Sequence, residues 1–245
     1  MKIGLCSVTF RKKTVDEIIE IAVKNHLNFI EWGADIHLKP GDFKMCDHIK
    51  NLCKQFGISY SYGSYFKYKD EDDFDLILKT AQRLETRDIR IWAMRKSSKD
   101  ITISEYTNFI NISKTIAKKA NKLNMNIHFE NHRKTLTDTT ESAIKLLEDI
   151  NEPNVYMYWQ PQADMTIDER IEALEKLRKY ISNVHVFNWD DDFKRYPLKE
   201  AKNEWKEYIE HLGKNRAYLL EFVKDDKVEQ FQKDLNILKQ LMRGN

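Results

Sequence analysis

The sequence predicts a single (β/α)8 barrel spanning residues 1–245. Three observations predict this fold. Eight short β-type runs start at intervals of roughly 30 residues, stretches with helical apolar periodicity lie between them, and helix-start motifs follow several of the runs. Barrels of this kind commonly use about 250 residues as one unit. No linker or shift in composition divides the chain, so we expect one domain.

The predicted strands alternate with predicted helices along the whole chain. The strand runs are 2–8, 28–32, 58–62, 88–93, 125–130, 154–159, 183–187 and 216–222. Apolar residues at helical spacing follow them, as at Leu76, Ile77, Ala81 and Leu84. This order is typical of βα units. An open doubly wound sheet is the alternative, but residues 8–13 lack the glycine-rich turn that usually follows its first strand.

Five predicted helices carry a capping motif at their start. In this motif the first residue accepts from free backbone amides, and a glutamate three positions later reaches back to it. The motifs begin at Thr14, Thr102, Asp138, Thr166 and Asp226. Each lies just after a predicted strand, which supports the βα order.

The composition argues against several classes of partner. Lys+Arg 41 against Asp+Glu 39 gives a net charge of +2 with both signs mixed, so no basic field for nucleic acid or anionic membrane is present. No apolar run approaches the roughly 18 residues of a membrane span. Three dispersed cysteines and no apolar leader predict a cytoplasmic protein. Cys46 and Cys53, spaced too widely for a zinc knuckle, are predicted to be small buried hydrophobes.

A barrel of this kind places its active site at the carboxyl ends of the strands. Four polar residues fall there, at the ends of the last four predicted strands: Glu130, Gln160, His185 and Glu221. Strand alternation directs all four toward the barrel axis, together with the deeper His128, which we expect to be a hydrogen-bonded core residue. Two converging carboxylates would repel each other unless a cation compensated them. We therefore predict one divalent metal ion bound by these four residues, with Mn, Co, Mg and Zn all compatible.

These residues give the chain a likeness to a known superfamily. The segments 29–33 (FIEWG), 128–132 (HFENH), 184–189 (VHVFNW) and 220–222 (LEF) resemble the xylose isomerase-like barrels, in the branch of sugar phosphate isomerases/epimerases. The likeness covers essentially the whole chain. It implies that Glu130, His185 and Glu221 hold a divalent metal ion. Where the family usually has an aspartate, this chain has Gln160, which lowers the ligand charge by one and should weaken binding of a hard cation.

The resemblance also implies a reaction, namely proton transfer beside the carbonyl of a small keto or aldo sugar or sugar phosphate. Glu130 and Glu221 are then the catalytic acid/base pair, and Glu31 and His132 are substrate contacts. The aromatic side chains of Trp92 and Trp189 would form apolar walls against the sugar. A phosphate could be met by residues 95–98 or 133–134. The predicted partner is thus a small molecule, and homo-oligomerisation stays open.

Two other functions are compatible with parts of the sequence. A metal-dependent phosphodiesterase related to abasic-site endonucleases would need a multi-metal cluster and a basic groove, against which seven scattered histidines and a near-neutral chain argue. A non-catalytic sugar-binding barrel with a degenerate metal site would explain Gln160. Metal content distinguishes the three: three zinc ions for the nuclease, one divalent ion for the isomerase and none for the binder.

Overall fold

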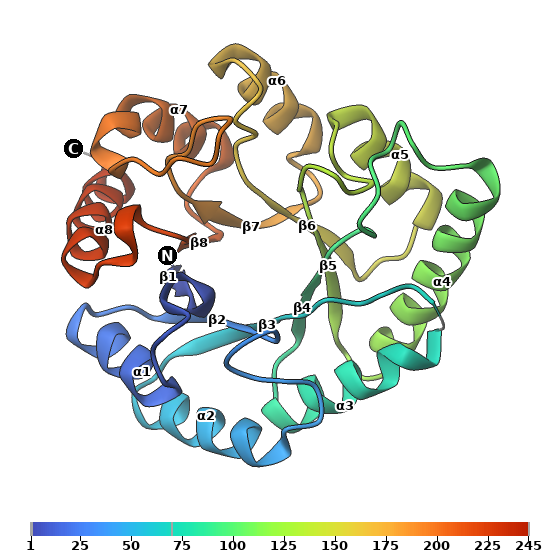
Figure 1. Cartoon of the computed structure of the whole chain (residues 1–245), viewed down its shortest axis with the longest axis horizontal. Coiled ribbons are helices and arrows are strands. Elements are labelled where there is room, and N and C mark those ends of the chain that lie inside the picture. Colours follow the sequence, from blue (N-terminus) through green and yellow to red (C-terminus); the bar gives the residue numbers. More distant parts are fainter. Residues whose placement is uncertain (1, 70, 245) are drawn as a thin grey trace.

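The predicted barrel is confirmed by the computed structural model, which describes residues 2–69 and 71–244. Eight parallel strands pair in sequence order, and β8 pairs with β1 to close the barrel (Figure 1). The strands are β1 (Lys2–Cys6), β2 (Phe29–Gly33), β3 (Ser59–Gly63), β4 (Asp88–Ile91), β5 (Asn126–Glu130), β6 (Val155–Trp159), β7 (Ile181–Val186) and β8 (Ala217–Leu220). All eight predicted strands are present. That residues 1–245 form one domain stays a prediction.

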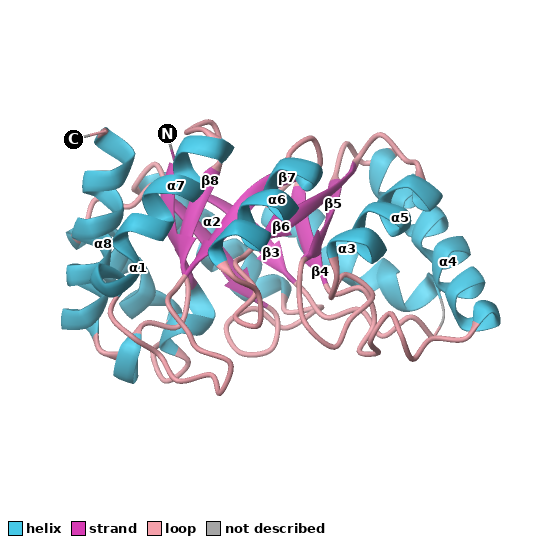
Figure 2. Cartoon of the chain, turned by 90° about the horizontal axis from the view of Figure 1, so that it is seen from above, coloured by secondary structure: helices cyan, strands magenta, loops and turns pink. Residues whose placement is uncertain are grey.

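The helices form a ring outside the strands (Figure 1). They are α1 (Val15–Lys24), α2 (Phe43–Gln55), α3 (Asp75–Leu84), α4 (Ile103–Asn121), α5 (Thr140–Ile150), α6 (Ile167–Leu177), α7 (Lys202–Leu212) and α8 (Val228–Arg243). Figure 2 shows the longer loops gathered on the side of the barrel that faces away from the two chain ends. These loops leave the carboxyl ends of the strands, where the site was predicted.

Three of the five predicted capping boxes are confirmed and two are wrong. Thr14, Thr102 and Thr166 each cap a helix together with the glutamate three positions later. Helix α5 is capped by Thr139 instead of Asp138, because the Asp138 carboxylate accepts from Ser97 Oγ and the Ser98 amide. Helix α8 starts without a side-chain cap, since Asp226 pairs with Arg195.

The two faces of the strands have opposite character. Outward-facing residues such as Ile89, Ile127 and Phe129 belong to the large apolar core between strands and helices. A much smaller apolar cluster lines the inside of the barrel, formed by Cys6, Val8, Phe29, Tyr158, Ala217 and Leu219. Most other inward-facing side chains near the carboxyl ends are polar. The outer core therefore provides most of the apolar burial, and the interior is free to carry charged groups.

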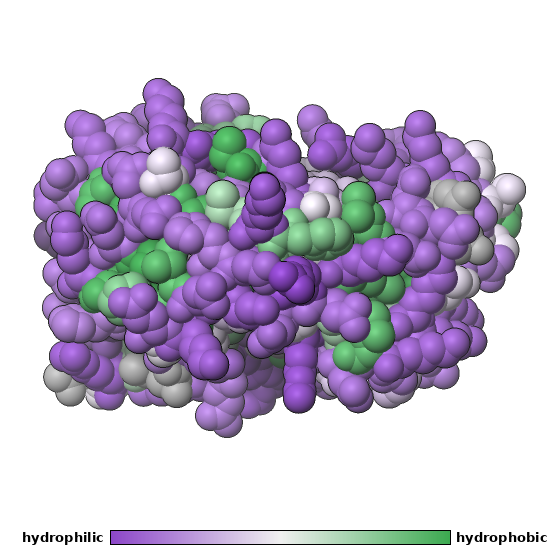
Figure 3. Space-filling model, turned by 90° about the horizontal axis from the view of Figure 1, so that it is seen from below, coloured by the Kyte–Doolittle hydropathy of each residue, from purple (hydrophilic) through white to green (hydrophobic). Residues whose placement is uncertain are grey.

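Two of the three cysteines lie in a helix outside the barrel strands. Cys46 and Cys53 lie in α2 and are buried free cysteines, as predicted. No helix in the described part of the chain is long and apolar enough to cross a membrane. Figure 3 shows one side of the molecule, which is largely hydrophilic with separate hydrophobic areas between the charged side chains.

Gly63, the last residue of β3, leaves space for a buried ion pair inside the barrel. A Cβ atom at this position would lie 2.6 Å from Arg90 Nη2 and 2.7 Å from Glu31 Oε1. Any larger residue would have to displace one of these two side chains. The absence of a side chain at Gly63 thus allows Arg90 and Glu31 to pair inside the barrel.

Candidate functional site

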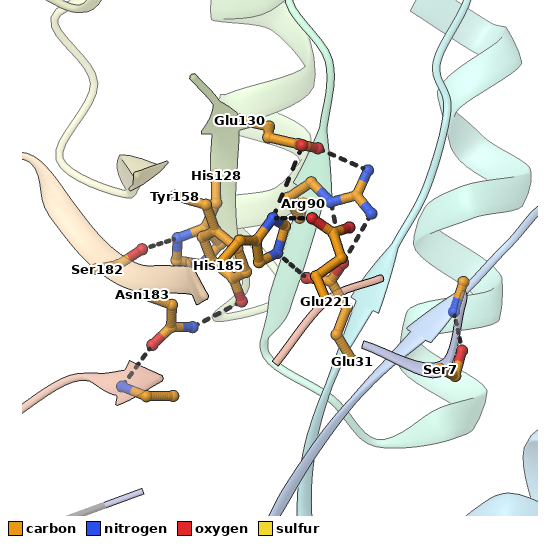
Figure 4. Close-up of polar contacts among 12 residues, drawn as sticks. Ser7, Glu31, Arg90, His128, Glu130, Tyr158, Ser182, Asn183, His185 and Glu221 are labelled. Atoms are coloured by element: carbon orange, nitrogen blue, oxygen red, sulfur yellow. Dashed lines mark hydrogen bonds and ion pairs between the residues drawn. The ribbon is translucent and has the colours of Figure 1, made fainter. Parts of the chain in front are cut away.

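The site is centred on His185, an inward-facing residue of β7 that is 0% exposed. Its Nδ1 atom lies 3.4 Å from Glu221 Oε2 and 3.7 Å from Glu130 Oε1, and its Nε2 atom lies 3.6 Å from Glu31 Oε2 (Figure 4). The three carboxylates come from β2, from the end of β5 and from the residue after β8. Three of the four predicted metal ligands, Glu130, His185 and Glu221, are therefore brought together at the carboxyl end of the barrel.

Arg90 on β4 connects two of these carboxylates. It donates to Glu31 Oε1 from Nε at 3.1 Å and from Nη2 at 2.7 Å. Its Nη1 atom lies 3.2 Å from Glu130 Oε2. Because Arg90 is 1% exposed, these are buried contacts in which the guanidinium fixes both carboxylates.

The charges in this cluster do not balance. Three carboxyl groups face one guanidinium, so two negative charges remain when all three carboxyl groups are ionised and His185 is neutral. Burial alone would lower the pKa of His185, but Cys6 and the carboxylates of Glu221 and Glu31 raise it well above its usual value. The cluster thus favours an added positive charge, either a proton on His185 or a bound cation.

The two predicted catalytic glutamates differ in their electrostatic surroundings. Burial would raise the pKa of Glu130, but Arg90 and His185 hold it well below the usual value. Burial raises the pKa of Glu221 to about 7, although His185 opposes the shift. Among the described residues, the one ion-pair contact of the Glu221 carboxylate is with His185, whereas Glu130 is also bound by Arg90 and Trp92. Glu221 is therefore the carboxylate with more freedom to exchange a proton.

Gln160, the fourth predicted ligand, follows β6 and is 9% exposed. Its Oε1 atom is buried and has no hydrogen-bond partner in the described structure. The residue lines a cavity of about 50 Å³ in the mouth of the barrel, together with Asn131, His132, Arg133, Pro161, Gln162, Ala163, Asp164, Phe187, Trp189, Asp190 and Phe193. Gln160 therefore lies both at the end of a strand and in the wall of the cavity. Its role as a metal ligand stays a prediction.

The predicted substrate contacts differ in their positions. Trp92 donates from Nε1 to Glu130 Oε2 at 2.7 Å, and its ring stacks on His132 with centroids 4.4 Å apart. Trp189 stacks on Phe187 at 4.3 Å and lines the cavity with His132. Glu31 is 1% exposed and its Oε1 atom accepts from Arg90, so it lies deeper in the barrel than the other three predicted substrate contacts. The roles of these four side chains in substrate binding stay predictions.

Threonine side chains fix the backbone at two of the strand ends. Thr9 Oγ1 accepts from the Phe222 amide at 3.1 Å and donates to the Leu220 carbonyl at 3.3 Å, so it brackets Glu221. Phe222 has φ 47°, a left-handed conformation that is uncommon outside glycine. At β5, Thr137 Oγ1 donates to the Glu130 carbonyl at 2.6 Å. Both carboxylates are thus held on fixed backbone, as positioned catalytic groups require.

A second polar network lies deeper in the barrel. His128 Nδ1 is 2.8 Å from Ser182 Oγ, and His128 Nε2 is 2.9 Å from Asp88 Oδ1. His128 is 2% exposed, which confirms the prediction that it is a hydrogen-bonded core residue. Hydrogen bonds from His128 and Asn126 lower the pKa of Asp88 to about 2, against the effect of its burial.

Sequence reasoning missed two residues of the cluster. Arg90 stands between Ile89 and Ile91, and a charged residue on the inner face of an otherwise apolar strand was an available signal. Cys6 ends β1 and lies near His185 and Glu221, with their potential ligand atoms within 4.8 Å of one another. Nothing in the spacing of the cysteines indicated this, because the contact depends on closure of the barrel between β1 and β8.

The residues present fit a divalent metal ion. The site has excess negative charge, and both nitrogens of the buried His185 and the Oε1 atom of Gln160 lack hydrogen-bond partners in the described structure. Buried polar atoms rarely lack a partner in folded proteins, and those that do often face a bound ion or water. Carboxylate oxygen, imidazole nitrogen and amide oxygen form a donor set that divalent transition metals accept.

One curated protein is similar to this chain in amino-acid sequence. No family model matches the chain. The curated 3-dehydroshikimate dehydratase of Bacillus anthracis is 26% identical over 206 residues, which cover 77% of this chain and 72% of that protein. The similar protein is thus an enzyme.

Solved structures share the whole barrel. The probable 3-DHS dehydratase AsbF of Bacillus anthracis has a TM-score of 0.82 and 19% identity, over 98% of this chain and 99% of its own. D-psicose 3-epimerase has a TM-score of 0.76 and 16% identity, over 100% of both chains. A xylose isomerase domain protein from Planctomyces limnophilus has a TM-score of 0.73 and 15% identity, over 99% of this chain and 96% of its own. The chain therefore shares the TIM-barrel fold of these three structures.

Proposed function

We propose that this chain is a divalent-metal-dependent enzyme that moves a proton at the carbon beside the carbonyl of a small sugar or sugar phosphate, and so isomerises or epimerises it. The observation that carries the proposal is the convergence of Glu130 and Glu221 on His185 Nδ1, at 3.7 and 3.4 Å, in a buried site beside a cavity. Two carboxylates of unequal proton affinity are the groups that such proton transfer needs.

Glu130, His185 and Glu221 would hold the metal ion, with Gln160 as a neutral fourth donor. A bound divalent ion supplies Lewis-acid polarisation of the substrate carbonyl, which makes the neighbouring C–H more acidic. Glu221, the less constrained carboxylate, takes or returns the carbon-bound proton. Glu130 stays ionised beside Arg90 and Trp92, and is the second acid/base candidate if a substrate proton comes within its reach.

The cavity supports a small polyhydroxylated substrate. Its lining combines the stacked rings of Phe187 and Trp189 with amide, carboxylate and imidazole groups. Aromatic faces suit the C–H surfaces of a sugar, and the polar groups suit its hydroxyls. Arg133 at the edge of the cavity is the candidate for binding a phosphate.

Dehydration is the second candidate, and the sequence relative favours it. The 26% identical protein is named a 3-dehydroshikimate dehydratase, and loss of water from a hydroxyketone begins with the same proton abstraction beside a carbonyl. The two reactions differ in their second step, since return of the proton gives an epimer or isomer, whereas loss of a hydroxyl group gives an unsaturated product.

The test is a panel of keto and aldo sugars, free and phosphorylated, together with 3-dehydroshikimate, incubated in D2O with the metal-loaded protein. Deuterium at the carbon beside the carbonyl supports the isomerase, and a product lighter by one water supports the dehydratase. Glu130→Gln and Glu221→Gln should abolish exchange while the circular dichroism spectrum is retained. The exposed Glu210→Gln is the matched control and should exchange normally. Full exchange in both site variants would remove these residues from the mechanism.

Metal analysis tests the cofactor and the alternatives independently of the substrate. One divalent ion per chain is expected. Three zinc ions would favour a phosphodiesterase, and no bound ion after loading would favour a sugar-binding protein. Either of these results would contradict the proposal.

A further inference from the structure

Cys6 lies between the apolar floor of the barrel and the charged cluster. It is the last residue of β1, is 0% exposed, and packs in the inner apolar cluster with Phe29, Tyr158 and Leu219. Its register partner on β2 is Glu31, one of the three clustered carboxylates. The thiol therefore faces inward at the level of the site.

The surroundings of Cys6 contain ready metal donors. One ligand atom each from Cys6, His185 and Glu221 lies within 4.8 Å of the other two, and all three residues are buried. Given bond lengths of about 2.0 to 2.3 Å, the donors of one tetrahedral zinc ion stand roughly 3 to 4 Å apart. Modest side-chain adjustment would bring this set to that spacing. Both ring nitrogens of His185 lack a hydrogen-bond partner in the described structure, with the nearest carboxylate oxygens 3.4 Å or more away, which is a second indication of a missing ligand.

Charge gives a reason for a sulfur donor in this particular chain. Gln160 is neutral and contributes no charge to a bound cation. A thiolate at Cys6 would contribute one negative charge to the ligand set. It would do so from β1, whereas Gln160 follows β6. The resulting set of sulfur, nitrogen and oxygen donors favours zinc or cobalt over magnesium, because soft thiolate binds hard cations poorly.

We propose that Cys6 is a ligand of the metal ion in this barrel, together with His185 and Glu221, and that it makes the site selective for Zn²⁺ or Co²⁺. On binding, the sulfur–metal bond forms as the S–H bond breaks, and the proton passes to solvent. This inference rests on the metal dependence in the proposed function, but it concerns a different residue and can fail separately.

The test replaces the native ion with Co²⁺ and records the absorption spectrum of the full-length protein. A thiolate ligand gives a strong sulfur-to-cobalt charge-transfer band in the near ultraviolet, beside the weaker visible bands that any bound cobalt gives. Cys6→Ser should lose the charge-transfer band and keep the visible bands. It should also weaken zinc binding by more than about tenfold, because replacing a residue that only contacts a metal ligand already lowers metal affinity by about 10- to 100-fold. Cys46→Ser, at a buried cysteine in α2, is the matched control and should keep the band.

Each outcome bears on the inference separately from the proposed function. Visible cobalt bands without the charge-transfer band in the unaltered protein would overturn the role of Cys6 and leave a metal-dependent enzyme without sulfur ligation. Failure to bind Co²⁺ would overturn the role of Cys6, and failure to bind Mn²⁺, Mg²⁺ and Zn²⁺ as well would overturn the proposed function. If Cys6→Ser does not fold, the spectrum of the unaltered protein still decides, and a shift of the band on replacing Co²⁺ with Ni²⁺ checks its assignment.

Discussion

Arg90 Nη2 donates to Glu31 Oε1 at 2.7 Å, with both side chains almost wholly inaccessible to solvent. The same guanidinium contacts Glu130, so one cation fixes the positions of two carboxylates from strands that are not adjacent. This arrangement makes the charged cluster sensitive to single substitutions, since each partner left behind is a buried charge.

Arg90→Met should destabilise the protein by about 3–5 kcal/mol, because it leaves Glu31 and Glu130 without their buried counterion. The double variant Arg90→Met/Glu31→Gln should recover part of this loss, since one of the orphaned charges is removed. Urea unfolding of the three proteins measures the difference. Arg83→Met, which removes an exposed ion pair with Asp47, should leave the free energy of unfolding nearly unchanged. A double variant as unstable as the single one would contradict the role given to Glu31.

Gly63→Ala should weaken both stability and metal binding. The added methyl group would clash with the Arg90–Glu31 pair, and overpacking of this kind costs about 1–3 kcal/mol. Gly57→Ala offers a contrast, since nothing lies within 4 Å of its Cβ position but its φ is +65°. That variant should lose stability and keep its metal affinity. Equal metal affinities in the two variants would show that Gly63 does not shape the site.

Gln160→Asp should tighten binding of a divalent ion, because it adds one negative charge beside a donor set that lacks it. Isothermal titration with Mn²⁺ and Mg²⁺ measures the change, and the gain should be larger for these hard ions than for Zn²⁺. Gln162→Asp, in the same cavity lining, controls for the general effect of an added charge. An affinity unchanged by Gln160→Asp would place Gln160 outside the coordination sphere.

Thr9→Val should reduce turnover more than substrate affinity. The substitution keeps the side-chain shape but removes the hydrogen bonds to Leu220 and Phe222, which fix the backbone on both sides of Glu221. Leaving such a buried group unpaired costs about 1–3 kcal/mol of stability. A lower kcat with unchanged KM, restored by Thr9→Ser, is the expected result. A change confined to KM would mean that Thr9 serves substrate binding instead.

The contribution of Asp88 to stability should disappear in acid. Its pKa is lowered to about 2 in the folded protein from an ordinary 3.8, so the ionised form is favoured by folding. The stabilisation is complete above the unfolded pKa and is lost as the pH falls through the folded one. The difference in unfolding free energy between the unaltered protein and Asp88→Asn should therefore shrink between about pH 4 and pH 2. A difference independent of pH would contradict this pairing.

Sequence periodicity was enough to predict the fold because strands and helices of a barrel are local patterns. Period-two runs located all eight strands, and alternation within them correctly directed His128, Glu130 and His185 toward the barrel interior. Capping was predicted less well, since Asp138 and Asp226 had competing partners in distant loops. A motif of four neighbouring residues does not indicate whether a distant side chain will compete for the capping residue.

The candidate site was predictable where chemistry fell at strand ends, as at Glu130, His185 and Glu221. Arg90 and Cys6 were missed because their importance depends on which strands become neighbours across the barrel. Gly63 could not be identified either, since its small size matters only once Arg90 and Glu31 meet. A single sequence does not indicate which side chains of distant strands will pack against each other, so the contacts of these three residues could not be predicted.

The hydrogen bonds of Thr9 also bear on the order in which the protein folds. Its partners Leu220 and Phe222 are 211 and 213 residues away in the chain, the distance of a nearly complete circuit of the barrel. Contacts between such distant segments carry a large loop-closure entropy and form late unless intervening structure has shortened the loop. Glu221 therefore acquires its fixed backbone only when β8 joins β1. A chain stalled with seven strands assembled would have much of its outer core and no working site, so recovery of activity during refolding should lag behind recovery of helical circular dichroism.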